Sequence, residues 1–178
     1  MKDVELRLIA ELMKNSRRSD RELAKIIGVS QPTVSRTIRR LEKEGYIKEY
    51  TVIPDFAKLG FEILAITFLG YKAVDVEDLQ KATKIASDML QKAYMECICI
   101  ETGAGFGYQA AIVSLHKDYS EYVGFMKRIK QGAHERYSFM DTSKYQSFLI
   151  GLKSGRRFRP LTFSTLANHV LALKEKKA

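Results

Sequence analysis

The strongest constraint on the fold of this chain is a pair of short amphipathic segments, residues 19–27 and 31–41, joined by a turn of only three residues. Ser19 begins the first segment with the pattern of a capping box, because a glutamate follows three residues later. Gly28 is suited to end that helix, since glycine adopts a positive φ without strain. Ser30 is then placed to cap the second helix. This spacing is typical of a helix-turn-helix.

The second segment has two chemically different sides. Val34, Ile38 and Leu41 recur at helical spacing and predict a buried stripe. Arginines and short polar side chains occupy the remaining surface. The second helix of a helix-turn-helix enters the major groove of DNA, where arginine contacts phosphates or guanine and shorter groups reach base edges. The expected DNA-binding residues are Gln31, Thr33, Ser35, Arg36, Arg39 and Arg40.

The flanking segments complete a predicted winged helix-turn-helix over residues 1–53. Residues 3–15 predict a supporting helix with acidic side chains in its first turn. Residues 46–53 alternate in the manner of a short β-wing, which Pro54 closes. The supporting helix is expected to bury Val4, Leu8, Ile9 and Leu12.

A second domain is predicted over residues 61–152, after a linker at 54–60. Strand-like runs alternate with two helical patterns in the order β-α-β-β-α-β, the ferredoxin-like split motif. The expected fold class is therefore α+β, with a helix-turn-helix domain followed by a ferredoxin-like domain and a C-terminal helical extension. The expected strands are 61–71, 95–101, 108–116 and 143–152, and the expected helices are 76–93 and 118–131, the latter ended by Gly132.

The first strand of this domain is apolar on both faces. Ile63 lies on one face, while Leu64 and Phe68 lie on the other. The two helices of a ferredoxin-like domain cover only one face of its sheet, and a bare apolar face is unfavourable in water. A second copy of the same sheet would cover it as an isologous dimer. We therefore expect a homodimer or a larger assembly.

Positive charge is concentrated at the two ends of the chain. Residues 1–60 hold 13 Lys and Arg against 9 Asp and Glu, residues 61–151 hold 10 against 11, and residues 152–178 hold 7 against 1. The overall charge of +9 suits a polyanionic partner. The basic extension at 153–178 predicts a helix that packs through its apolar stripe. That stripe consists of Leu161, Leu166, Val170 and Leu173, and Arg156, Arg157 and Arg159 are candidates for phosphate contacts.

Nothing in the sequence predicts a membrane segment, a metal site or a cofactor. No apolar run approaches the roughly 18 residues of a transmembrane helix, and the first residues do not resemble a secretory signal. We therefore expect a cytoplasmic protein. Cys97 and Cys99 lie two residues apart, on one face of a predicted strand, and are expected to be reduced core residues. His116, His134 and His169 form no metal-ligand pattern with them.

The whole arrangement resembles the Lrp/AsnC family of transcription regulators over roughly residues 1–151. The stretches that carry the resemblance are DVELRLIAEL, SDRELAKIIGVSQPTVSRTIRRLEKEGYIKEYTVIPDFAKLGF and TGAGFGYQAAIVSLH. The resemblance implies sequence-specific binding of double-stranded DNA by a dimer or an assembly of dimers. It also implies a small-molecule effector, in many members an amino acid, bound between the C-terminal modules.

The glycine-rich stretch TGAGFG is where such an effector is expected to bind. Many family members carry acidic residues after the first glycine of this loop, whereas here Ala104 and Gly107 stand in GAGFGY. The usual partner for a ligand ammonium group is thus partly missing. The alternative is a plain turn whose glycines supply positive φ. The candidate effector-binding residues are Gly103, Gly105 and Gly107.

The sequence pattern allows two other functions. Siroheme decarboxylases resemble the two-domain arrangement, and His134, Arg136 and Tyr137 could surround an acidic tetrapyrrole together with the glycine loop. Stand-alone sensors that act through protein partners resemble the second domain alone. The sequence shows no base and nucleophile at the spacing of a known catalytic pair, and the helix predicted to bind DNA keeps all of its basic residues. We therefore expect a regulator without catalytic residues. A coloured purified protein, or a lack of affinity for DNA duplexes, would favour the enzyme.

Overall fold

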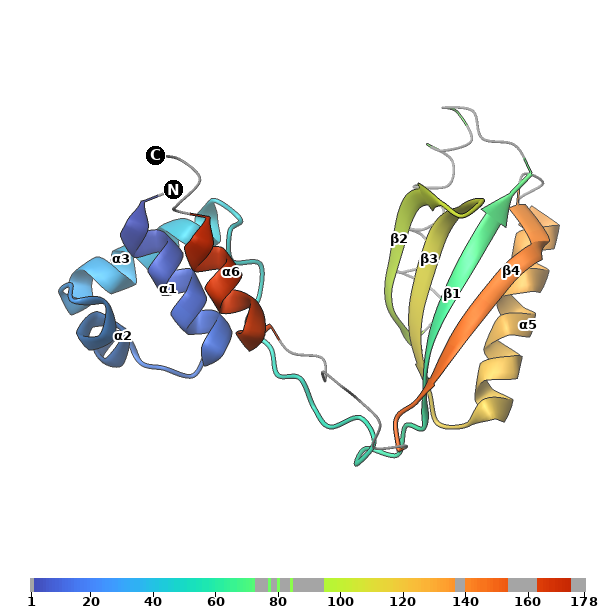
Figure 1. Cartoon of the computed structure of the whole chain (residues 1–178), viewed down its shortest axis with the longest axis horizontal. Coiled ribbons are helices and arrows are strands. Elements are labelled where there is room, and N and C mark those ends of the chain that lie inside the picture. The colour runs from blue at the N-terminus through green and yellow to red at the C-terminus, as the bar shows by residue number, and fades with distance from the viewer. Residues whose placement is uncertain are drawn as a thin grey trace. The chain divides into compact units, whose positions relative to one another are not determined.

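The computed structural model of the chain describes residues 2–72, 77, 80, 84, 95–136, 140–153 and 163–173. The chain divides into two compact units, each with its own hydrophobic core. The helical unit combines residues 1–53 with residues 158–178, and the sheet unit comprises residues 54–157 (Figure 1).

The predicted helix-turn-helix is confirmed, and its local signals act as expected. The Ser19 hydroxyl accepts a hydrogen bond from the Glu22 N–H, and the Glu22 carboxylate accepts one from the Ser19 N–H at 2.7 Å. Gly28 ends its helix with a φ of 81°. The Ser30 side chain accepts a hydrogen bond from the Thr33 N–H. The helices are α1 (Asp3–Lys14), α2 (Asp20–Ile27) and α3 (Gln31–Lys43).

The apolar side of α3 fixes this helix to its unit. Val34 and Leu41 are fully buried. Ile38 packs against the same core, which includes the fully buried Leu8 of α1 and Leu23 of α2. Full burial of one such side chain contributes about 1.5–3 kcal/mol. The core therefore determines which side of α3 faces solvent.

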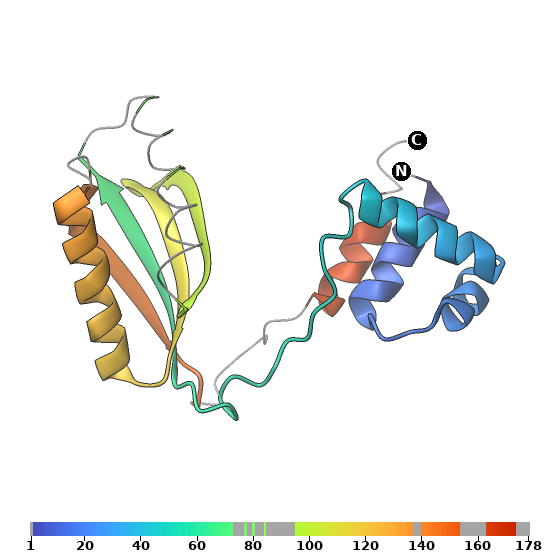
Figure 2. The same cartoon turned by 180° about the vertical axis from the view of Figure 1, so that it is seen from behind.

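A short C-terminal helix belongs to the helical unit, although the sheet unit precedes it in the sequence. It comprises a 3₁₀ turn at Ser164–Leu166 and α6 at Ala167–Ala172, and it packs along α1 (Figures 1 and 2). Leu8 of α1 faces the helix-turn-helix core. Ala10, about 200° further round α1, is also fully buried, as is Ala167 of α6. Hence α1 is buried on two sides.

The apolar stripe predicted for this C-terminal segment is wrong in its members. Leu166 and Leu173 are exposed and Val170 is half-buried, whereas Ala167 is fully buried. The 3₁₀ turn advances about 120° per residue instead of 100°, which shifts the phase of the side chains that follow it. The predicted residues Leu161, Arg156, Arg157 and Arg159 lie outside the described residues.

The β-strand predicted at residues 46–53 is not formed. The segment is extended, but it pairs with no strand in the part of the chain that the structure describes. Its first two N–H groups, those of Tyr46 and Ile47, donate to the Leu41 carbonyl oxygen at 2.9 and 3.2 Å. Alternating side chains favour an extended backbone, but a strand also needs a hydrogen-bonded neighbour.

The sheet unit contains one antiparallel sheet in the order β2-β3-β1-β4. One helix, α5, packs on one face of this sheet (Figures 1 and 2). This is the strand order of a ferredoxin-like fold, as predicted. The elements are β1 (Ile63–Tyr71), β2 (Cys97–Gly105), β3 (Tyr108–His116), α5 (Tyr119–Arg136) and β4 (Met140–Gly151).

The two helices predicted for this unit have different outcomes. The helix at 76–93 lies outside the described residues, except that Glu77, Gln80 and Lys84 are helical. The helix end predicted at Gly132 is wrong, because α5 continues beyond it. A glycine inside a helix costs only about 1 kcal/mol, and the burial of α5 side chains against the sheet offsets that cost.

The two faces of the sheet differ in burial. On the face that α5 covers, Ala65 and Thr67 of β1 are fully buried. On the other face, Ile66 is half-buried and Phe68 is exposed. The exposed Phe148 of β4 lies directly opposite Ile66 in the register. No described helix covers this second face, which we call the open face of the sheet.

The segments that enter and leave the sheet unit start side by side. The Leu152 N–H donates to the Glu62 carbonyl oxygen at 2.7 Å, and Lys153 Nζ lies 2.6 Å from Glu62 Oε1. Ile63 at the start of β1 is paired with Gly151 at the end of β4. Both connections to the helical unit therefore begin at the same end of neighbouring strands.

Candidate nucleic-acid interface

Basic side chains form the solvent-facing side of α3. Arg36, Arg39 and Lys43 are exposed, on the side opposite the buried Val34 and Leu41. Lys43 is not among the predicted DNA-binding residues. Its position seven residues after Arg36 places it on the same side of a helix, so the spacing contained the necessary signal.

The guanidinium groups of Arg36 and Arg39 keep donors free for a ligand. Arg36 Nε donates to the Pro32 carbonyl oxygen at 3.3 Å, which leaves its two Nη groups. Within the described part of the chain, Arg39 forms no hydrogen bond or ion pair. A guanidinium is a planar fork of donors that matches phosphate oxygens or the O6 and N7 atoms of guanine. These two arginines are therefore suited to DNA.

Ser35 and Arg40, in contrast, are bonded to their own unit. Ser35 Oγ donates to the carboxylate of Asp20 at the start of α2. Arg40 donates from a terminal nitrogen to the carboxylate of Glu5 on α1, and its Nε lies 3.8 Å from Glu44 Oε1. These contacts give both side chains a part in holding α3 in place. A direct contact of either with DNA stays a prediction.

The ion pair between Arg40 and Glu5 is partly buried, since Glu5 is only 7% exposed. Burial raises the pKa of this carboxyl group, but the Lys2 N–H, at 2.7 Å, and the Arg40 guanidinium outweigh burial and lower the pKa. Glu5 is therefore ionised at neutral pH, and Arg40 compensates a charge that water cannot fully solvate.

The first turn of α3 presents shorter polar groups. Gln31 is exposed. Thr33 is half-buried, and its hydroxyl lies 2.8 Å from Ser30 Oγ. The first residues of a recognition helix approach base edges most closely. Gln31 is thus placed to offer an amide, which can both donate and accept.

The glycine-rich stretch closes a tight hairpin between β2 and β3. Gly105 pairs with Tyr108, so the turn contains only Phe106 and Gly107, with φ values of 53° and 83°. Two consecutive positive φ values are typical of a type I′ turn. The strand therefore extends four residues beyond its predicted end at residue 101, and turn geometry alone accounts for Gly107.

The other two glycines of this stretch are not required by packing. In the described part of the chain, a Cβ atom at Gly103 or Gly105 would have no neighbour within 4 Å. The space beside the hairpin is therefore open. An effector-binding role for Gly103, Gly105 and Gly107 stays a prediction.

The remaining candidate groups do not form a reactive centre in the described part of the chain. Cys97 and Cys99 are free and half-buried, and burial raises the pKa of the Cys97 thiol to about 11. The described residues contain no group of three or more His, Cys, Asp and Glu arranged to hold a metal, and no helix long and apolar enough to cross a membrane. The side chains of His134, Arg136 and Tyr137 lie outside the described residues.

Comparisons with known proteins agree with this geometry. A family model described as winged helix-turn-helix DNA-binding matches residues 1–48. PH0061, an uncharacterised HTH-type transcriptional regulator of Pyrococcus horikoshii, is 31% identical over 131 residues, which cover 71% of this chain and 83% of that protein. The crystal structure of PH0061 matches with a TM-score of 0.69 and 26% identity over 90% of this chain and 98% of that one.

Two further proteins are similar to the chain. The regulator LrpC of Bacillus subtilis is 42% identical over 74 residues, and the chain spans about half of its length, since the match covers 51% of LrpC and 42% of this chain. The structure of AsnC from Escherichia coli shares the fold, with a TM-score of 0.65 at 16% identity over 90% of this chain and 97% of that one. A basic helix-turn-helix joined to a ferredoxin-like domain defines a class of transcription regulators. The chain belongs to the Lrp/AsnC family of HTH-type transcriptional regulators.

Proposed function

We propose that the protein regulates transcription by sequence-specific binding of double-stranded DNA. The observation that carries the proposal is the exposed basic side of α3, which the core holds toward solvent. Gln31, Arg36 and Arg39 are proposed to reach base edges, and Lys43 is proposed to contact phosphate. The relatives are named as transcriptional regulators, and we propose no catalytic role and a cytoplasmic location.

The proposal includes a homodimer formed through the open face of the sheet. Ile66, Phe68 and Phe148 leave an apolar surface on this face, and a second copy would remove it from water. A two-fold dimer presents two α3 helices. Its preferred duplexes should therefore contain inverted half-sites about one helical turn apart, roughly 34–36 Å, or a multiple of that spacing.

A small-molecule effector is proposed on family membership alone. The hairpin glycines Gly103, Gly105 and Gly107 are its proposed neighbours, because open space lies beside the first two. A ligand-dependent change in duplex affinity would test this part of the proposal separately.

Selection of bound duplexes from a pool of random oligonucleotides by the full chain tests the main proposal. We expect enrichment of an inverted repeat, and affinity for it should fall with salt by a log–log slope of about −0.9 for each neutralised phosphate. The matched control replaces both Arg36 and Arg39 by Ala. It should keep its circular dichroism spectrum and lose the enrichment. A pool that stays random, or one that the control enriches equally, would contradict the proposal.

A further inference from the structure

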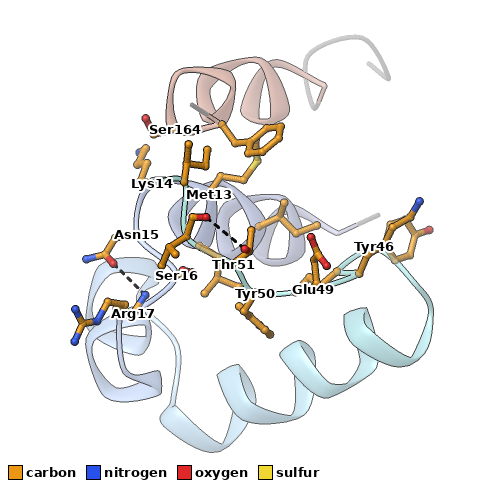
Figure 3. A pocket seen from close by; sticks show the side chains of 17 residues that line it. Met13, Lys14, Asn15, Ser16, Arg17, Tyr46, Glu49, Tyr50, Thr51 and Ser164 are labelled. Carbon is orange, nitrogen blue, oxygen red and sulfur yellow. Dashed lines mark hydrogen bonds between the residues drawn. The ribbon is translucent and has the colours of Figure 1, made fainter. Parts of the chain in front are cut away.

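A groove of about 750 Å³ lies on the helical unit, and all of its lining residues belong to that unit (Figure 3). Its walls are the second half of α1, the extended segment at 46–53, and Phe163 and Ser164 at the start of the C-terminal helical turn. The groove therefore takes its shape from the packing of the C-terminal segment on α1. Its volume is in the range of small-molecule sites.

The lining of the groove is largely apolar and remains accessible. Tyr46, Val52 and Phe163 are exposed, and the half-buried Leu12 and Met13 of α1 lie beside them. Large apolar side chains scattered singly over a surface need no explanation. Gathered in one concavity, they are typical of a site that buries the apolar body of a ligand.

One end of the groove is cationic. Figure 3 shows Lys14 and Arg17 at the end that lies away from Glu49, and Lys48 also lines the groove. Lys14 is paired with Glu11 at 2.7 Å. Among the described residues, the side chains of Arg17 and Lys48 form no ion pair. The groove thus combines an apolar length with an excess of positive charge, since three basic side chains line it against the one acidic side chain of Glu49.

We propose that this groove binds an amphipathic monoanion. The aromatic or aliphatic body of the ligand would lie against Val52 and Phe163, and its carboxylate or related anionic group would approach Arg17 at the cationic end, with Lys48 adding to the positive charge of the lining. A cation is disfavoured because the lining holds three basic side chains against the single carboxylate of Glu49, and a neutral molecule would leave this excess positive charge unused. The site differs in place and in chemistry from an amino-acid site between sheet units.

Binding in the groove would restrain a segment that is attached to α3. The Tyr50 hydroxyl donates to Glu42 Oε1 at 3.0 Å. Partial burial and the Glu42 carboxylate raise the pKa of Tyr50 to about 12, so this donor persists at neutral pH. An effect of the ligand on duplex affinity rests on the proposed function, whereas ligand binding does not. The two are therefore measured separately.

Two fluorescent probes test the site, 1-anilinonaphthalene-8-sulfonate and N-phenyl-1-naphthylamine, which share an aromatic body and differ by the sulfonate. In titrations of the full chain, the anion should bind once per chain, tighter than the neutral probe by about tenfold or more, as one charge-assisted hydrogen bond would give. Replacing Arg17 and Lys48 together by Gln should lower the affinity for the anion to that for the neutral probe. Phe163→Ser should weaken both probes. Decanoate should displace the anion, while 1-decanol should not.

Tyr119→Ser is the matched control, because it removes an exposed aromatic ring from the sheet unit at the start of α5. Tyr119 is 63% exposed and Phe163 is 53% exposed, and the control should leave both affinities unchanged. Equal affinity for the two probes would overturn the proposal, as would loss of binding in Tyr119→Ser but not in Phe163→Ser. Binding that disappears as the protein concentration rises would assign the groove to a second copy instead. Duplex affinity that saturating anion leaves unchanged would refute the coupling to α3 while the site itself stands.

Discussion

The helical unit and the sheet unit each present an accessible surface, and the two surfaces have opposite chemistry. Arg36 and Arg39 stand in water on a helix that the core holds rigidly. Ile66, Phe68 and Phe148 form an apolar face of the sheet. Charged side chains are well solvated without a partner, whereas exposed apolar area is unfavourable. The first surface is therefore suited to reversible contact with DNA, and the second to a lasting contact with another copy.

The largest expected effect concerns association through the open face of the sheet. Phe148→Glu should convert the proposed dimer to a folded monomer, because the two-fold axis repeats the substitution and each carboxylate would lose its water. The dimer dissociation constant should rise by about 100-fold or more, as a loss of roughly 3 kcal/mol implies. Light scattering coupled to size exclusion measures this change.

The neighbouring residue supplies the control for this substitution. Leu149 follows Phe148 in β4 and is paired with Ala65 of β1, so its side chain lies on the face of the sheet that α5 covers. It is 37% exposed. Leu149→Glu should reduce stability and leave the chain dimeric. If both variants remain dimers, or both become monomers, the assignment of the interface to the open face is wrong.

The next effect concerns the charged surface. Arg39→Ala should weaken binding of the selected duplex by about 1–3 kcal/mol if the side chain makes a bidentate base contact. Thermal unfolding should be unchanged, because Arg39 is exposed and forms no hydrogen bond or ion pair with the described residues. A filter-binding titration at fixed salt, beside a melting curve, separates the two quantities. Unaltered affinity would show that this side of α3 does not read DNA.

A smaller effect distinguishes Arg40 from its neighbour. Arg40→Met should destabilise the helical unit by roughly 1–2 kcal/mol, since it leaves the buried Glu5 carboxylate without its cation and the pair is partly solvated. Adding Glu5→Gln should restore most of that loss, because no buried charge remains. Urea unfolding of the wild type and of these two variants measures the coupling. Equal losses in the single and the double variant would argue against it.

The smallest expected effect is a loss of stability of the sheet unit in acid. His116 of the sheet unit is fully buried, with Nε2 at 2.9 Å from Ser114 Oγ and no described partner for Nδ1. Burial lowers its pKa from 6.5 and Arg128 lowers it further, against the opposing fields of Glu121 and Glu96. The unfolded chain then binds the proton more tightly than the folded chain does.

The resulting stability is present above about pH 6.5 and is lost as the pH falls through the lowered pKa of folded His116. Melting temperatures at about pH 7.5 and about pH 5 should therefore differ more for the wild type than for His116→Gln. The variant keeps a polar side chain and removes the titration. Equal pH dependence in the two proteins would exclude His116 as the cause.

The helix-turn-helix could be predicted because its signals are local. Ser19, Gly28 and Ser30 act within a single turn of their own helices, and their hydrogen bonds and φ values are those expected. Val34 and Leu41 follow from helical spacing alone. The exposed side of α3, with Arg36 and Arg39, is simply the remainder of that pattern.

Contacts between distant segments could not be predicted in the same way. Arg40 bonds Glu5 across 35 residues, and nothing in the pattern of α3 distinguishes Arg40 from Arg39. The extended segment at 46–53 lacks a neighbouring strand in the described chain, a fact that alternation does not encode. The docking of α6 on α1 depends on the second buried side of α1. Ala10 lies on that side, and an alanine in a helix does not by itself predict a buried position.

The paired exits of the sheet unit have a consequence for the order of folding. Before the sheet forms, docking of the C-terminal helix on α1 must close a loop of about 110 residues between Ile53 and Phe163. Once Glu62 and Leu152 are bonded, only about 20 residues lie between these bonded positions and the two residues Ile53 and Phe163, and closure becomes more favourable by roughly 1.5 kcal/mol. During synthesis the first three helices leave the ribosome long before their last partner exists. Formation of the sheet therefore favours the docking of the C-terminal helix on α1, because it brings the ends of the connection together.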